Sequence, residues 1–140
     1  MCTAQRHRSF EIHETVHAVR DKFQQSAERH EFAIVAYCFM PDHVHLLVEG
    51  SSERADMTTF ASDAKQRSGF WFKRRHQARL WQPSYYDRIL RNDEATISVI
   101  RYIVENPVRA GLVRAPADYP FSGSLRFTMC EILEAVSWQP

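Results

Sequence analysis

The chain has 140 residues, a formal net charge of +1 and 44% hydrophobic residues, which is enough for one compact core and too little for two ordinary domains. We therefore expect a single domain over residues 1–140. No stretch approaches the roughly 18 apolar residues of a membrane span and no apolar signal segment opens the chain, so we expect a cytoplasmic protein without membrane contact. Three cysteines without a Cys-x-x-Cys spacing indicate neither a disulfide framework nor a cysteine zinc site.

The first part of the chain has the spacing of a helix followed by two strands. Apolar residues recur every three or four positions from Ile12 to about His30, as on one face of a helix. Residues 32–40 are rich in β-branched and aromatic side chains and end at a turn signal, Pro41-Asp42. Residues 43–49 then resume an extended apolar pattern. We expect one helix and then a hairpin of two strands.

A basic segment follows the expected hairpin. Residues 57–75 lack proline and predict a helix, although Ser68-Gly69 weakens its middle. Residues 61–92 hold eight Lys or Arg against two Asp, with aromatic residues among them, a mixture that suits a single strand of nucleic acid. A solvated basic helix with its aromatic side chains in the core has the same composition, so each candidate phosphate contact is equally a plain surface residue. These candidates are Lys65, Arg67, Arg74, Arg75 and Arg88.

The last long helix is predicted over residues 93–106. The segment before it, residues 81–90, is expected to be a loop leading into a short strand. Asn92 or Asp93 can cap the helix, and Pro107 is expected to close it. The apolar residues of this helix fall within one broad arc, which we expect to pack on a sheet. Strands and helices that alternate in one short chain indicate a small α/β sandwich.

Two pairs of polar residues are candidates for chemistry. His43 and His45 project from the same face of the expected strand, where two imidazoles can hold one metal ion. Two core histidines satisfied by hydrogen bonds are the plainer interpretation, because this spacing is common. Tyr102 and Asn106 lie one helical turn apart, at the margin of the apolar arc. A metal site with a neighbouring nucleophile could form there, whereas a tyrosine that packs its ring on the core is the more usual case.

The order and spacing of the motifs say more than any single motif. After His43 and His45 come Lys65-Gln66-Arg67 and then the segments 80–88, 101–113 and 118–124. Over about residues 10–125 this series closely resembles the REP-associated tyrosine transposases, within the wider single-tyrosine HUH transposase family.

The resemblance implies an α+β fold, a ferredoxin-like sandwich with a central antiparallel sheet and packed helices. It implies that His43 and His45 bind a divalent metal, Mg²⁺ or Mn²⁺, and that Asn106 is the third ligand. It also implies that Tyr102 is the nucleophile, which attacks phosphorus, releases a 3′-hydroxyl and leaves a 5′-phosphotyrosine link. The implied activity is cleavage and joining of single-stranded or hairpin DNA.

Other interpretations stay open. Tyr85 and Tyr86 also lie near basic residues, but only Tyr102 has a polar partner one turn away that could bind the same metal. A DNA- or RNA-binding module without turnover is the main alternative function. A structural zinc protein is a third, although it lacks the four strong ligands of a closed zinc site. A monomer is favoured over a dimer.

The start of the chain departs from the family pattern. Family members normally begin with a strand before the segment that matches Cys2-Thr3, so we expect that strand to be mostly absent. Such a loss would leave an exposed sheet edge, and it would reflect either a start assigned too late or a decayed copy. Residues after about Phe127 lie outside the resemblance and receive no functional interpretation.

Overall fold

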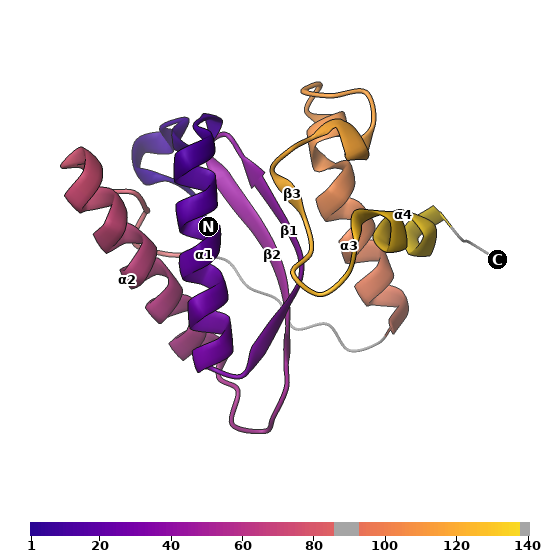
Figure 1. Cartoon of the computed structure of the whole chain (residues 1–140), viewed down its shortest axis with the longest axis horizontal. Helices are drawn as coiled ribbons and strands as arrows, with labels where there is room; N and C mark the ends of the chain where they lie inside the picture. The colour runs from indigo at the N-terminus through magenta and orange to yellow at the C-terminus, as the bar shows by residue number, and fades with distance from the viewer. Residues whose placement is uncertain (86–92, 138–140) are drawn as a thin grey trace.

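The computed structural model of the chain describes residues 1–85 and 93–137. A three-stranded antiparallel sheet lies between two layers of helices (Figure 1). Strand β1 spans Phe32–Met40, β2 spans His43–Gly50, and β3 is the short Ser122–Gly123. The strand order is β2-β1-β3, so the strand that the chain makes first lies in the centre. The predicted α+β sandwich with a central antiparallel sheet is confirmed.

Helices cover both faces of this sheet. Helix α1 packs against β1 and against α2, whereas α3 packs against β1 and β2 from the opposite side and also contacts α4 (Figure 1). None of the helices in the described residues is long and apolar enough to cross a membrane. The α-helices are α1 His13–Arg29, α2 Met57–His76, α3 Asp93–Arg109 and α4 Met129–Ser137. Short 3-10 turns occupy Ala4–Arg6, Ser9–Glu11 and Pro116–Asp118.

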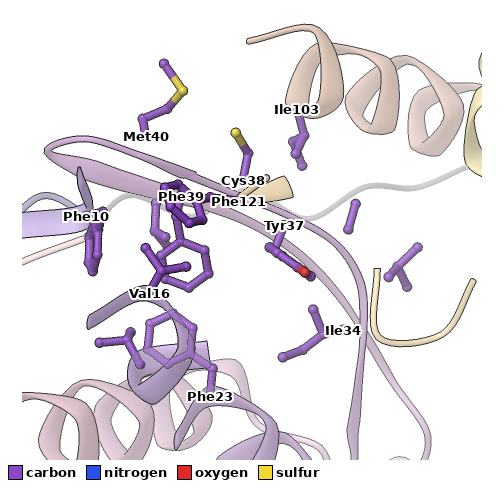
Figure 2. Close-up of a cluster of buried hydrophobic side chains, with 14 of the residues drawn as sticks. Phe10, Val16, Phe23, Ile34, Tyr37, Cys38, Phe39, Met40, Ile103 and Phe121 are labelled. Carbon is purple, nitrogen blue, oxygen red and sulfur yellow. The ribbon is translucent and has the colours of Figure 1, made fainter. Parts of the chain in front are cut away.

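Strand β1 is buried along most of its length because a helix covers each of its faces. Phe39 points to the α1 side, where its ring centroid lies 5.1 Å from that of Phe10 and 6.0 Å from that of Phe23. Cys38 points to the other side, toward Ile103 of α3 (Figure 2). The alternation of a strand therefore divides the core into two halves, and side chains on the Cys38 face lie against α3.

Helix α2 forms as predicted in spite of its weak middle. Asp56 caps its start by accepting two backbone N–H groups of the first turn, at 2.9 and 3.3 Å. The Ser68 hydroxyl donates to the Ala64 carbonyl at 2.6 Å and accepts the indole N–H of Trp81 at 2.9 Å. A β-carbon at Gly69 would lie 3.6 Å from the same indole ring. Contact with Trp81 thus stabilises the part of the helix that its propensities weaken.

The end of α3 differs from the prediction. Pro107 does not close the helix, because α3 continues to Arg109 with Pro107 inside its last turn. The proline removes one backbone N–H, but the N–H of Ala110 bonds to the carbonyl of Asn106 at 3.0 Å and that of Leu112 to the carbonyl of Pro107 at 2.9 Å. The Pro107 ring is fully buried, so its packing offsets the missing hydrogen bond. Asn92, one of the two predicted caps, lies outside the described residues.

The first residues of the chain contact the edge of β2. Cys2 forms an isolated antiparallel bridge with His43, and Thr3 forms another with Trp81. The backbone N–H of Val44 also bonds to the carbonyl of Met1 at 2.8 Å. Among the described residues, β2 therefore lies at an edge of the sheet, and isolated bridges rather than a full strand cover its first positions.

Candidate active site

Two histidines of β2 lie side by side under α3. The ring centroids of His43 and His45 are 4.9 Å apart and their planes are nearly perpendicular, at 89°. His45 lies opposite Cys38 in the β1–β2 ladder, which places it on the α3 side of the sheet, while Val44 between the two histidines is buried. Within the described residues the His45 ring makes no hydrogen bond. The two imidazoles thus share one face, as the strand spacing predicted.

Helix α3 brings Tyr102 to this pair. The ring centroid of Tyr102 lies 5.7 Å from that of His45, in an edge-to-face arrangement. The side chain of Tyr102 is 54% exposed, so a ligand can reach it from solvent. Asn106 lies one turn further along the same helix and is half-buried, and its side-chain amide has no hydrogen bond among the described residues. The two histidines and Tyr102 therefore lie together, and Asn106 follows Tyr102 on the same face of α3.

Asp42 holds one of the histidine rings. Its Oδ1 lies 2.7 Å from Nδ1 of His43, and its Oδ2 accepts a hydrogen bond of 2.9 Å from Nε of Arg6. Burial raises the pKa of Asp42, but the hydrogen bonds from His43 and Arg6 outweigh this effect and keep the pKa below its ordinary value. The ionised carboxylate favours a proton on Nδ1, which leaves the lone pair on Nε2 of His43. In the sequence, Asp42 indicates only a turn after Pro41.

The second histidine is neutral at physiological pH. Burial, together with a smaller contribution from the neighbouring His43, lowers the pKa of His45 to about 4. A neutral imidazole can give its lone pair to a metal ion without first losing a proton. Cys38, across the ladder, is not a comparable donor, because burial raises the pKa of its thiol to about 12.

The two histidines need a third ligand of another residue type to hold a metal ion at this site. Within the part of the chain that the structure describes, no group of three or more His, Cys, Asp or Glu side chains could hold a metal ion. His43 and His45 offer two nitrogen donors, and the amide oxygen of Asn106, one helical turn from Tyr102, is a candidate third donor. Such a set would leave coordination positions open for water or a substrate oxygen.

Arg109 is a charged residue of the site that lies in the matched segment 101–113 and has no role predicted from the sequence. Its guanidinium carbon lies 4.2 Å from the centre of the Tyr102 ring, and its Nη2 donates to the Tyr102 carbonyl. Glu105 lies 3.7 Å from its other terminal nitrogen. The spacing of seven residues, two helical turns from Tyr102, is the signal that could have identified it. A guanidinium beside a phenol is well suited to bind a phosphate.

The predicted phosphate contacts fall into two groups. The Lys65 ammonium donates to the carbonyl of Gln82 at 2.6 Å and lies 5.9 Å from the centre of the Tyr85 ring. The other described candidates line a groove between α1 and α2, on the side of the sheet away from Tyr102. They are Arg67, Arg74 and Arg75. Arg88 and Tyr86 lie outside the described residues. Among the tyrosines that the structure describes, Tyr102 alone has a ring contact with the histidine pair.

Comparison with known proteins identifies the class to which this arrangement belongs. The family model described as "Transposase IS200 like" matches residues 1–106, a range that contains both histidines, Tyr102 and Asn106. This match covers well over half of the chain. The chain therefore belongs to the IS200-like transposase family.

Curated relatives agree with the resemblance that the motifs indicated. A putative REP-associated tyrosine transposase of Haemophilus influenzae is 29% identical over 129 residues, which are 84% of this chain and 73% of the relative. The REP-associated tyrosine transposase of Escherichia coli is 29% identical over 94 residues, which are 65% of this chain and 53% of the relative. The resemblance to REP-associated tyrosine transposases is confirmed.

A solved structure shows the same fold. It is described as a REP-associated tyrosine transposase bound to a REP hairpin, and it matches this chain with a TM-score of 0.73 at 23% identity. The match covers 86% of this chain and 72% of the other.

Proposed function

We propose that the protein is a metal-dependent endonuclease and strand transferase that cuts single-stranded DNA at REP-type hairpins through a covalent link to Tyr102. The observation that supports this most directly is the contact between Tyr102 and His45, beside the second histidine of β2. The relatives support the substrate class, because two are named REP-associated tyrosine transposases and the similar solved structure holds a REP hairpin.

His43, His45 and Asn106 would hold Mg²⁺ or Mn²⁺. The neutral ring of His45 and the fixed ring of His43 fit this role, because each offers a nitrogen lone pair to the ion. The bound ion would polarise a non-bridging oxygen of the scissile phosphodiester. Imidazole and amide ligands form a set of intermediate hardness, so both ions should support the reaction in vitro. Mg²⁺ is the more abundant of the two in cells.

Tyr102 would exchange one phosphate ester for another. Its oxygen bonds to phosphorus as the bond from phosphorus to the 3′-oxygen breaks, and the departing oxygen takes up a proton to become a hydroxyl. Water can accept the phenol proton, because Tyr102 is about half exposed. Arg109, which lies over the tyrosine ring, would bind the negative charge of the phosphate. Since no ester bond is lost, a 3′-hydroxyl can reverse the step, and this allows strand transfer.

The proposed nucleophile and the proposed metal ligands lie together in one chain. The Tyr102 ring contacts His45 of the same chain. This supports cleavage by a monomer, with the nucleophile and the metal ligands in the same molecule.

Nucleic-acid binding without cleavage is the second candidate function. It is favoured by the basic residues that line the groove between α1 and α2, because they lie on the other side of the sheet from Tyr102. A module that only bound a structured strand could use such a surface without any nucleophile.

Denaturing electrophoresis separates these two functions. The purified chain is incubated with hairpin DNA from the flanks of its own gene, in Mg²⁺ or Mn²⁺, with the DNA labelled at either end. Because tyrosine joins the 5′-phosphate side of the cut, DNA labelled at its 3′ end should give a retarded band that survives denaturation. DNA labelled at its 5′ end should give a shorter free fragment. Tyr102→Phe should remove both products and the matched control Tyr85→Phe should retain them; binding without any adduct would favour the non-cutting module.

A further inference from the structure

A groove that combines basic and aromatic side chains lies between α1 and the second half of α2. Its volume is about 480 Å³, within the range of roughly 300–1,000 Å³ that is usual for ligand sites. Helices α1 and α2 cover one side of the sheet, and α3 with Tyr102 covers the other (Figure 1). The groove is therefore separate from the candidate active site. It is lined by Lys22, Arg67, Phe70, Trp71, Arg74 and Arg75.

The groove has an excess of positive charge. Four of its lining residues are basic and none is acidic. Arg67 is paired with Asp63 at 2.9 Å, and Arg75 with Glu14 at 3.0 Å. The remaining two basic residues, Lys22 and Arg74, have no salt bridge in the described portions of the chain. They are available to an anionic ligand.

The groove also presents aromatic rings to solvent. Phe70 is 62% exposed, more than any other large hydrophobic side chain among the described residues. The guanidinium carbon of Arg74 lies 5.6 Å from the centre of its ring. Trp71 beside it is half-buried, and its ring centroid lies 6.5 Å from that of Phe72 and 6.2 Å from that of His76. A partly buried indole next to an open phenyl ring is a platform on which unpaired bases can stack.

We infer that this groove is a second binding site, which takes a single-stranded DNA segment and does not cut it. Bases would stack on Phe70 beside Trp71, and Lys22 and Arg74 would bind the adjacent phosphates. A duplex offers phosphates but no open base faces, and an acidic peptide offers charge but no bases to stack. The identity of the strand as DNA rests on the proposed function, whereas the presence of the groove does not. Because the groove and Tyr102 lie on opposite sides of the sheet, a segment bound in the groove is not the segment that is cut. The groove would therefore anchor an unpaired flank of the substrate.

Oligonucleotide binding to the full chain tests this site. The probe is a fluorescent oligothymidine of eight nucleotides, followed by anisotropy in the Tyr102→Phe chain with EDTA, so that neither cleavage nor metal contributes. Phe70→Ala should weaken binding by at least about fivefold, the lower end of base–aromatic stacking. Arg74→Ala should also weaken binding and should reduce the slope of log affinity against log salt by about 0.7, as expected for one lost phosphate contact. Lys73→Ala, which removes an exposed cation of the same helix turn outside the groove, should leave the affinity nearly unchanged.

Three outcomes would overturn the inference. One is that Phe70→Ala binds as tightly as its parent chain. Another is that Lys73→Ala loses as much affinity as Arg74→Ala, since the effect is then one of general charge. The third is that an unlabelled duplex or poly-glutamate competes as well as the unlabelled single strand. The side chains changed are exposed, so each variant should remain folded. An unchanged thermal melting curve then excludes unfolding as the cause of a lost affinity.

The adduct assay keeps this inference distinguishable from the proposed function. If the chain with Tyr102 forms the covalent adduct while Phe70→Ala binds the oligonucleotide normally, the second binding site is refuted and the nuclease function is supported. If no adduct forms but Phe70→Ala loses oligonucleotide binding, the second binding site is supported and the nuclease function is refuted.

Discussion

The hydrogen bond between Asp42 and His43 predicts that loss of this carboxylate weakens metal binding at the candidate site. In Asp42→Ala, Nδ1 of His43 loses an acceptor at 2.7 Å, so the ring is free to rotate and to take the tautomer with its proton on Nε2. Loss of such a supporting partner typically lowers metal affinity by about 10- to 100-fold. This corresponds to about 1.4 to 2.8 kcal/mol of binding free energy.

Titration with Mn²⁺ measures this effect directly, from the paramagnetic resonance signal of the free ion at pH 7.5. Asp42→Asn keeps an acceptor oxygen but loses the charge, so its affinity should fall between those of the parent and Asp42→Ala. Arg6→Ala is the matched control, because it removes the other, more exposed partner of the same carboxylate and should have the smaller effect. A Mn²⁺ affinity in Asp42→Ala equal to that of the parent, with an unchanged melting curve, would refute the reasoning.

Three further predictions follow from other contacts. Arg109→Ala should slow adduct formation in a single turnover by about tenfold or more, since a charge-assisted hydrogen bond to the phosphate is lost, and an unchanged rate would contradict a role for this residue. Trp81→Phe removes the buried hydrogen bond to Ser68 and should lower the free energy of unfolding in urea by about 1–3 kcal/mol, whereas an unchanged midpoint would contradict this. Burial raises the pKa of Asp63, but the hydrogen bonds that its carboxylate accepts, first of all from Ser26, outweigh burial and keep the pKa below its ordinary value. The ionised carboxylate therefore stabilises the fold above the ordinary pKa, and this stability is lost as the pH falls through the lowered pKa. Asp63→Asn should therefore flatten the fall in melting temperature below about pH 4, and an unchanged pH profile would contradict the assignment.

The fold was predictable where a local pattern repeats over many residues. The helix from Ile12 to His30 and the hairpin after it match α1, β1 and β2 to within one residue at each end. The predicted end of α3 was wrong. The expectation that proline ends a helix considers the lost backbone hydrogen bond and not the burial of the Pro107 ring, which stabilises the helix here. Helix α4 was not predicted at all. Ile132 and Val136 are buried one turn apart in it, but a nine-residue element has too short a pattern to stand out.

The candidate site was predictable in its parts and not in its surroundings. Strand alternation places two histidines on one face, and helical spacing does the same for Tyr102 and its neighbour. That the two elements meet depends on tertiary packing, so only the family resemblance indicated it. The role of Asp42 is recognised only from its side-chain contact with His43. The spacing of seven residues between Tyr102 and Arg109 is visible in the sequence, but only the contact between the guanidinium and the ring gives it a meaning.

The basic residues of α2 show how composition alone can mislead. Lys65 and Arg67 were grouped as one set of phosphate contacts because they are close in the sequence. Two residues in a helix are separated by roughly 200°, so these side chains point to opposite sides of α2. Lys65 contacts the segment at Gln82, whereas Arg67 shares the groove with Arg74, two turns later. The angular positions of these residues on the helix follow from the sequence, but a count of charges does not include them.

The surroundings of the tyrosines explain why Tyr102 is the best candidate for the nucleophile. The hydroxyl of Tyr119 is buried and donates to the carbonyl of Phe39, and burial raises its pKa, while the hydroxyl of Tyr37 accepts a hydrogen bond from Arg20 at 3.2 Å. The hydroxyl of Tyr102 has no hydrogen bond among the described residues, and the residue is held in place by its helix. Ile103 and Val104, the next two residues of that helix, are buried to 2% and 0% exposure, and they fix the helix on the sheet without restraining the phenol oxygen. A nucleophile must be positioned by its backbone and ring while its oxygen stays free to form a new bond. Of the described tyrosines, Tyr102 alone combines such a free hydroxyl with a ring contact to the histidine pair.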